Sequence, residues 1–277
     1  MSSVMDEEAV NLGGGAAIIA LVGAGLAWAA RTSALDLLVA VAAVQALLAF
    51  TWIHVLRVPG RHGGVVIAGL AAAGSDLAAS LWPHSRLAAM LAVIGLAVPV
   101  MFVHQLLRGA ARVRVGESFG AISLLVVGEA SLPALLQLRH QFPDVRLGGD
   151  PTFAVIVVTT GALLVGLFSD MTLPVPRFDE EVPRGLPAVL VAALVGAGIG
   201  HLALRESPAF ASGRGAFIGA AVGIVAALLA VAIAFVEHGV PLAESGFARR
   251  ARPVLTVLVP LALAAPVGFL LCVAVRT

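Results

Sequence analysis

Residues 151–172 read "PTFAVIVVTTGALLVGLFSDMT", and this stretch decides the fold. Between Phe153 and Phe168 it holds no charged residue, and it then stops at Ser169 and Asp170. An α-helix rises about 1.5 Å per residue, so about 20 apolar residues cross the hydrocarbon core of a bilayer. The stretch is therefore predicted to be a membrane-spanning helix that ends at a carboxylate.

The rest of the chain has the same apolar character. Of its 277 residues, 60% are hydrophobic and 12% are charged, and the mean hydropathy is +1.04. Soluble globular proteins have about 25% charged residues. The composition therefore predicts a polytopic integral membrane protein that forms a single domain over residues 1–277. The net charge of +1 gives no indication of a nucleic-acid partner.

Apolar runs near the length of a membrane span recur along the chain, and we expect all of them to be helical. Backbone polar groups in lipid must be paired within the protein, which leaves helices or closed barrels, and these continuous runs lack the alternation of barrel strands. The prediction is an all-α fold with about nine transmembrane helices. Their expected ranges are 12–30, 34–56, 63–82, 87–107, 118–138, 151–173, 186–204, 215–236 and 254–275.

The placement of arginine predicts how the chain is oriented in the membrane. All 17 basic residues are arginine, and ten of them lie in the connections after the second, fourth, sixth and eighth spans, against seven on the other side. Short cytoplasmic loops carry the excess of basic residues. We therefore expect a protein of the cytoplasmic (inner) membrane of a bacterium, with its N-terminus in the cytoplasm and its C-terminus outside.

Ionisable residues inside the expected spans are functional candidates, because charge is costly in hydrocarbon. Asp76 and Glu129 lie about thirteen residues into spans of the same direction, roughly 20 Å from the cytoplasmic face. His201 lies near the outer end of the seventh span. Protonated, the two carboxyls can hydrogen-bond across helices. Ionised, they can line a polar path with His201, which predicts a proton- or cation-coupled transporter or a flippase.

Four other polar residues lie at the expected cytoplasmic ends of spans, namely His54, His104, Asp170 and Glu237. The two histidines are expected to anchor their helices at the interface rather than to bind metal, because neither has a second ligand four residues on. The two carboxylates either mark the point where a helix meets headgroups and water or belong to a site.

Glycine spacing predicts one close helix contact. The stretch "GAFIGAAVG" places Gly215, Gly219 and Gly223 on one face of a helix, which permits close approach of a second helix. The chain also lacks the phosphate-loop, His-Glu-x-x-His, paired Cys-x-x-Cys and dinucleotide-binding signatures. These absences argue against the corresponding classes of enzyme.

Residues 96–277 resemble the phosphatidate cytidylyltransferase (CDP-diacylglycerol synthase) family. "PTFAVIVVTTGALLVGLFSD" resembles the family helix that ends in Ser-Asp, "LLAVAIAFVEHG" lies where the family has Gly-Asp-x-x-Glu-Ser, and "PVLTVLVPLALAAPVGFLL" resembles its closing helix. The resemblance implies N-terminal helices over about residues 1–95 and a region like the catalytic half after them. The family joins CTP to phosphatidic acid, with carboxylates that hold divalent cations.

The residues that would carry this reaction are mostly replaced. Asp170 and Glu237 keep acidic positions of the family motifs. Uncharged residues stand where the family has three aspartates and an arginine, at Ala234, Thr256, Val257 and Val259. Each lost carboxylate removes both a metal ligand and a charge that offsets the ion. We therefore expect a catalytically degenerate relative with a lipid-associated scaffold or regulatory role, without a cofactor or a metal ion.

The resemblance also implies partners and an alternative. Membrane lipid is the expected partner, with other membrane proteins as a further candidate. The basic residues expected at lipid headgroups or substrate are Arg177, Arg184, Arg249, Arg250 and Arg252. The alternative is an active, divergent transferase that holds Mg²⁺ with Asp170, Glu237, Asp179, Glu180 and Glu181. The sequence leaves the substrate and the oligomeric state open.

Overall fold

The structure, a computed structural model, describes residues 2–109, 113–143, 149–172, 176, 178, 185–210, 213–239 and 242–276. Within these residues the chain is helical without a β-sheet, and nine segments are long and apolar enough to cross a membrane. The predicted all-α, polytopic membrane fold is thereby confirmed. The helices are α1 (Ser2–Thr32), α2 (Ala34–Val55), α3 (Arg61–Leu81), the 3₁₀ turn η1 (Pro83–Ser85), α4 (Ala88–Leu107), α5 (Val115–Ser131), α6 (Ala134–Gln141), α7 (Pro151–Thr172), α8 (Leu186–Leu204), α9 (Arg214–Gly239) and α10 (Gly246–Ala274).

The fifth span differs from its prediction, because it consists of two helices. α5 and α6 together form one candidate span, Val115–Gln141, that is interrupted at Leu132 and Pro133. Proline has no amide hydrogen and cannot donate within a helix. The chain tightens here, and the amide of Leu135 donates to the carbonyl oxygen of Leu132 at 3.0 Å. The sequence predicts one continuous helix over 118–138, whereas the structure has a break at the proline.

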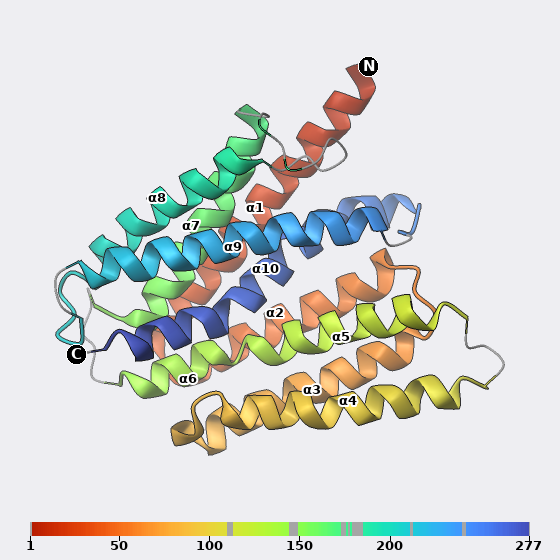
Figure 1. Cartoon of the computed structure of the whole chain (residues 1–277), viewed down its shortest axis with the longest axis horizontal. Helices are drawn as coiled ribbons and strands as arrows, with labels where there is room; N and C mark the ends of the chain where they lie inside the picture. The colour runs from red at the N-terminus through yellow and green to blue at the C-terminus, as the bar shows by residue number, and fades with distance from the viewer. Residues whose placement is uncertain are drawn as a thin grey trace.

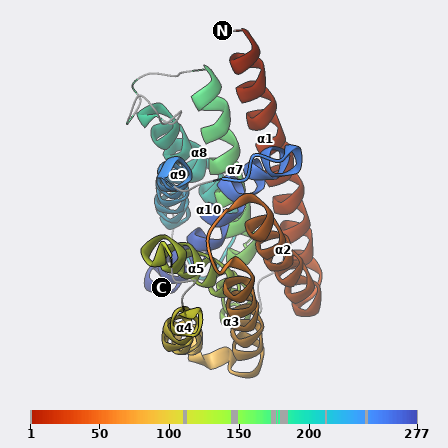
Figure 2. The same cartoon turned by 90° about the vertical axis from the view of Figure 1, so that its right-hand side faces the viewer.

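α10 is the central helix of the bundle. Figures 1 and 2 show it passing through the middle, and it contacts α1, α2, α5, α6, α7 and α9. Leu258, Ala262 and Phe269 are among its fully buried side chains. The helix contains three prolines, which membrane helices tolerate where neighbouring helices compensate the freed backbone groups. α10 is therefore the core against which the other helices pack.

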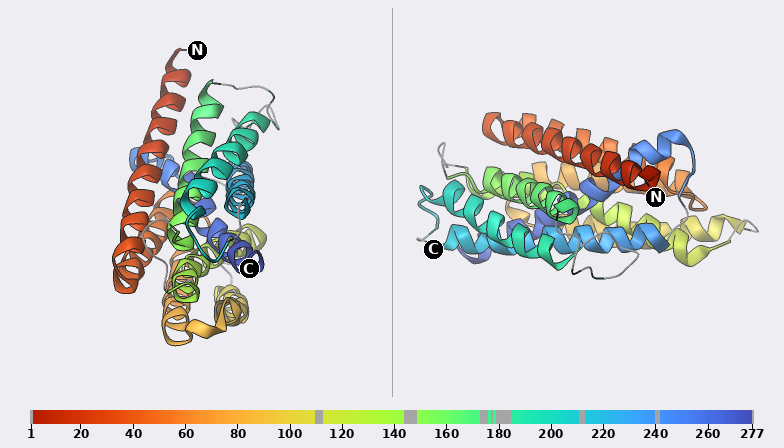
Figure 3. Two further views of the ribbon diagram at one scale, coloured as in Figure 1. Left: turned by 90° about the vertical axis from the view of Figure 1, so that its left-hand side faces the viewer. Right: turned by 90° about the horizontal axis from the view of Figure 1, so that it is seen from above.

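α8 and α9 lie side by side and run in opposite directions (Figures 1 and 3). Gly196 and Gly200 of α8 lie against Gly219 and Gly215 of α9, and Gly223 continues the same face of α9. A Cβ atom added at Gly215 would lie 2.6 Å from the carbonyl oxygen of Gly200. The two backbones are thus in direct contact, as small residues allow. This register places the start of α8 beside the end of α9.

α2, α4, α7 and α9 all end at the same end of the bundle, which we call the even face (right and upper side of Figure 1). Three hydrogen bonds tie this face together. The amide of Ala243 donates to the carbonyl oxygen of Val55 at 2.8 Å, and the Ser118 hydroxyl donates to the carbonyl oxygen of Pro59 at 2.6 Å. The amide of Gly185, at the start of α8, donates to Oδ1 of Asp170 at 3.1 Å.

The outward surface of the helices is apolar. On α4, the large side chains of Leu91, Leu96, Phe102 and Leu107 are all exposed. Soluble monomers rarely expose contiguous apolar patches of this kind. The surface therefore suits contact with lipid chains, in agreement with the lengths and compositions of the helices.

Candidate functional site

Polar side chains are buried at membrane depth where α2, α3 and α5 meet. Nε2 of Gln45 on α2 donates to Oδ1 of Asp76 on α3 at 3.3 Å and to the main-chain oxygen of Glu129 on α5 at 3.0 Å. Gln45 is 4% exposed and Glu129 is 1% exposed, whereas Asp76 is half-buried. We call Asp76 and Glu129 the carboxyl couple. The structure places these two residues, which the sequence predicts at similar depth, on neighbouring helices joined by Gln45.

Small residues allow the three helices to approach this closely. Gly64 of α3 lies against Ile122 of α5, and an added Cβ atom at Gly64 would be 2.5 Å from Cγ1 of that isoleucine. Gly128, which precedes Glu129, lies against Leu48 of α2. The side chain of Gln45 lies on the buried face of α2 and so reaches both neighbours. The local sequence thus forms a tight junction with polar groups in its interior.

The carboxylate of Glu129 is the most unusual group in this junction. Both of its oxygens are buried and have no hydrogen-bond partner among the described residues. The hydroxyl of Ser75, next to Asp76, is also fully buried and lacks a partner within the same residues. An isolated buried charge costs on the order of several kcal/mol, and a second acidic residue, Asp76, is tied to the same junction through Gln45. Chemically, the junction can bind and release a proton or hold a small cation.

His201 does not join the carboxyl couple. Its side chain is exposed on α8, and α8 packs against α7 and α9. The couple lies between α3 and α5, with Gln45 of α2. A single path through Asp76, Glu129 and His201 would have to cross other helices of the bundle.

Asp170 and Glu237 both lie at the even face, each in its own contacts. Asp170 is half-buried and accepts the hydrogen bond from the Gly185 amide, which joins the end of α7 to the start of α8. Oε2 of Glu237, on α9, accepts from Nε of Arg252 on α10 at 3.0 Å. Within the part of the chain that the structure describes, no group of three His, Cys, Asp or Glu side chains is placed to hold a metal ion.

A pocket of about 330 Å³ opens at the even face beside the Glu237–Arg252 ion pair. Arg250 is exposed on the adjacent turn of α10. Two other predicted headgroup residues, Arg177 and Arg184, lie outside the described residues, as do the loop acids Asp179, Glu180 and Glu181. The pocket is lined by Val55, Leu242, Ala243, Glu244, Ala248, Arg249 and Arg252.

His54 and His104 each contact a neighbouring segment at the even face. The ring of His54 lies 4.4 Å from the ring of Phe50 and 5.4 Å from that of Phe247, measured between centroids. Nε2 of His104 lies 3.2 Å from the carbonyl oxygen of Gly60. The first contact joins the end of α2 to the start of α10, and the second joins the end of α4 to the α2–α3 connection.

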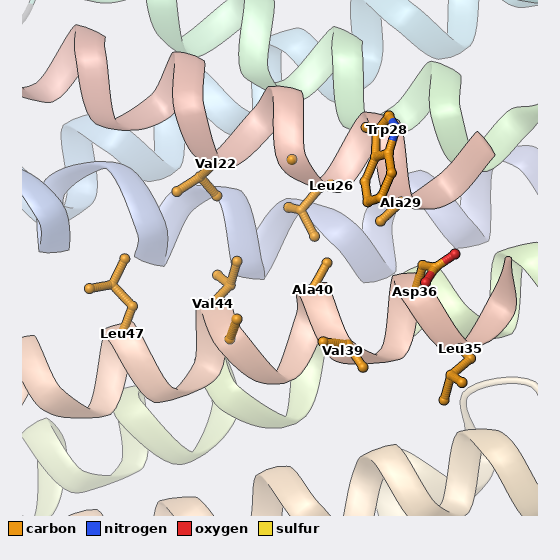
Figure 4. A pocket seen from close by; sticks show the side chains of 12 residues that line it. Val22, Leu26, Trp28, Ala29, Leu35, Asp36, Val39, Ala40, Val44 and Leu47 are labelled. Carbon is orange, nitrogen blue, oxygen red and sulfur yellow. The ribbon is translucent and has the colours of Figure 1, made fainter. Parts of the chain in front are cut away.

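A larger groove of about 470 Å³ lies between α1 and α2 (Figure 4). Its walls are apolar, with Leu26 and Trp28 on α1 and Val39 on α2. The one carboxylate at its edge, Asp36, accepts a hydrogen bond from the Ser33 hydroxyl at 2.7 Å at the start of α2. The Ser33 hydroxyl also accepts from the Asp36 amide at 3.0 Å and so caps α2. The carboxylate of Asp36 is thus held by the cap of its own helix.

Sequence reasoning missed the role of Gln45. The available signal was an amide side chain in the middle of an apolar run, which has to find a partner when it is buried. It also missed the ion pair between Arg139 and Asp150, 3.2 Å apart at the opposite end of the bundle. Asp150 accepts there from the amide of Thr152 at 2.8 Å and so caps the start of α7.

No family model, no curated protein and no solved structure matches the chain. The fold and the site therefore define its class by themselves. It is an α-helical polytopic membrane protein with a carboxyl couple buried between three of its helices.

Proposed function

We propose that the protein is a proton- or cation-coupled membrane transporter, or a flippase, in which the carboxyl couple carries the ion. The observation that supports this function is the Glu129 carboxylate, whose oxygens are buried at membrane depth without a partner among the described residues. Ionisable groups inside membrane spans are expensive and typically mark ion pathways or proton relays. A purely structural role for Glu129 would call for a hydrogen-bond partner.

The exposure of the two carboxyls suits a relay. Glu129 is fully buried, whereas Asp76 on the neighbouring helix is half-buried. An ion can therefore reach Asp76 first and exchange with Glu129 in the interior. Transporters expose such a site alternately to the two faces of the membrane by rocking helices against each other.

Flux through liposomes tests the function. The purified protein is reconstituted with a trapped pH-sensitive dye, and a pH gradient is imposed across the membrane in Na⁺-containing and Na⁺-free buffers. We expect wild-type flux above that of empty liposomes and its loss in Glu129→Gln. The matched control is Glu117→Gln, at an exposed ion pair with Arg114 near the start of α5, which should keep the flux. Equal flux in wild type and Glu129→Gln would exclude the couple as the pathway.

We propose further that the even face lies in the cytoplasm and that the membrane is the inner membrane of a bacterium. The N-terminus would then be cytoplasmic and the C-terminus external. The support is the arginine distribution, with ten of 17 in the connections that follow the even-numbered spans.

A second candidate function is a lipid-associated scaffold or regulatory protein related to phosphatidate cytidylyltransferases but without their catalysis. The pocket at the even face favours it, because Arg249 and Arg252 line a space of about 330 Å³ where a phosphate headgroup can meet two guanidinium groups. Two experiments test this candidate. We expect no Mg²⁺-dependent conversion of CTP and phosphatidic acid by the purified protein, and detection of that conversion would favour the active transferase instead. Arg249→Gln should weaken binding of phosphatidic acid, whereas Arg86→Gln, exposed at the opposite end, should not.

A further inference from the structure

We propose that the ion bound at the carboxyl couple is a single proton, shared between Glu129 and Asp76, and that Gln45 is the residue that positions it. This inference rests on the proposed transport function in one respect, since it names the ion of that transport. The geometry that carries it is the junction of α2, α3 and α5. There the amide of Gln45 bonds both to the Asp76 carboxylate and to the main chain of Glu129, whose own buried carboxyl has no hydrogen-bond partner among the described residues.

The first step concerns what Gln45 contributes. Its amide nitrogen has two hydrogens, and the structure offers both an acceptor: Oδ1 of Asp76 at 3.3 Å and the main-chain oxygen of Glu129 at 3.0 Å. A donor pointing at Asp76 stabilises the ionised form of that carboxyl. It also places an amide hydrogen where a metal cation would need an oxygen ligand. The cluster is therefore arranged for an anionic Asp76 and against a metal ion.

The second step concerns the surrounding charges. Between their terminal residues, the helices that pack around the couple carry no other ionisable side chain at its depth. α2 has none between Asp36 and His54, and α10 has only the buried thiol of Cys272, near its end, between Arg252 and Arg276. On α3, α4, α5 and α6 the remaining ionisable groups lie toward the helix ends: Arg61, His62, His104, Glu117, Arg139 and His140. Two charged carboxylates at this junction would thus lack a counter-cation at their depth, in a medium of low dielectric constant.

One proton resolves this conflict. With the proton on Glu129, the pair carries one negative charge, and that charge lies on Asp76, which has a hydrogen-bond donor and partial access to the surroundings. Carboxyl pairs that share a proton behave as one unit with two titration steps. In the exchange step the Glu129 hydroxyl passes its proton to the Asp76 carboxylate, and Asp76 releases it to water, so that no other reactant is needed. Ca²⁺ and Mg²⁺ in proteins take six or more ligands, mostly oxygens, and within the described residues no three His, Cys, Asp or Glu side chains are grouped to hold a metal ion.

Infrared difference spectroscopy of the reconstituted protein tests the proposal. We expect a carbonyl-stretch band of a protonated carboxyl group in wild type that shifts on transfer from H₂O to D₂O. The band should be absent in Glu129→Gln and present in the control Glu117→Gln. Gln45→Leu removes the donor that stabilises ionised Asp76, so we expect part of the Asp76 carboxyls to be protonated and to give a second carbonyl-stretch band. The additional change Asp76→Asn should remove this second band. A structural role of Gln45 alone would not create this band.

The outcomes separate this inference from the proposed function. An exchangeable Glu129 band without flux in liposomes would remove transport but keep the proton site. A second outcome is flux in liposomes without the Glu129 band, together with carboxylate absorptions that shift when Na⁺ or Mg²⁺ is added. This outcome would support transport but overturn the assignment of the ion as a proton. If Glu129→Gln does not elute as wild type on size exclusion, Asp76→Asn serves instead, and an unchanged rate of deuterium exchange in that variant would contradict the shared proton.

Discussion

Glu129 combines features that are seldom found together in a stable membrane interior. It is 1% exposed, and neither carboxylate oxygen has a partner among the described residues. A buried charge without a compensating partner destabilises the folded state. Replacement of buried ionic groups by well-packed apolar residues is often neutral or stabilising. If Glu129 is kept for ion binding, it should therefore reduce the stability of the fold.

This reasoning predicts a trade-off between stability and transport at one residue. We expect Glu129→Met to raise the free energy of unfolding by about 1–3 kcal/mol and to abolish flux, since a similar volume is filled without a polar group. Thermal unfolding in detergent measures the first effect. Glu117→Met, at the exposed pair, should change stability by less than about 0.5 kcal/mol. A fall in the melting temperature of Glu129→Met would mean that the carboxyl has structural partners.

Part of the site could be predicted from single residues and part could not. Asp76 and Glu129 stand out because acidic residues interrupt apolar runs, and their similar depth follows from counting along the helices. Which helices pack together depends on the tertiary arrangement, so the sequence could not tell that Gln45 would bridge the couple or that His201 would lie on α8 away from it. Arg252 was expected at a lipid headgroup, and in the structure it also pairs with Glu237.

At the scale of helices, glycine decides how α8 and α9 meet. The spacing of Gly215, Gly219 and Gly223 singles out one face of α9, and in the structure this face lies against Gly196 and Gly200. An added side chain on that face would collide with the backbone of the opposite helix. Helix pairs of this kind associate through backbone contact rather than through interlocking side chains.

A matched pair of substitutions on α8 tests this contact. Gly196→Leu places a side chain against the carbonyl of Gly219, whereas Gly198→Leu points into open space. We expect the first to destabilise the protein by about 3 kcal/mol or more, since overpacking a tight contact forces backbone shifts. The second should leave stability nearly unchanged. Thermal unfolding of the two variants in the same detergent gives the comparison, and equal melting temperatures would refute backbone contact at this face.

The positions of the helices were predictable, because hydropathy alone reports the length of an apolar run. The predicted segment 186–204 matches α8 and 87–107 nearly matches α4. The break in the fifth span was not predicted, although Pro133 is visible in the sequence. Prolines within α10 do not interrupt that helix, so proline alone does not distinguish a break from a tolerated kink.

At the scale of the whole molecule, the even face gathers the sequence's most polar connections. Hydrogen bonds fasten the α9–α10 connection to the end of α2, and the start of α5 to the α2–α3 connection. α10 contacts six other helices. The carboxyl couple lies between this face and the opposite one, and it can serve transport only if those two faces lie on opposite sides of a membrane.

Labelling from the two sides of the membrane tests that requirement most directly. The background is Cys272→Ala, which removes the buried native thiol. Single cysteines then replace Arg57, Arg114 and Glu244 at the even face, or Ser85 and Pro143 at the opposite end, and a membrane-impermeant maleimide is added to sealed spheroplasts or inside-out vesicles. We predict that the first group reacts only in inside-out vesicles and the second only in spheroplasts. Reaction of Arg57→Cys and Glu244→Cys from different sides, or of both groups from the same side, would contradict a membrane-crossing bundle with the couple between its two faces.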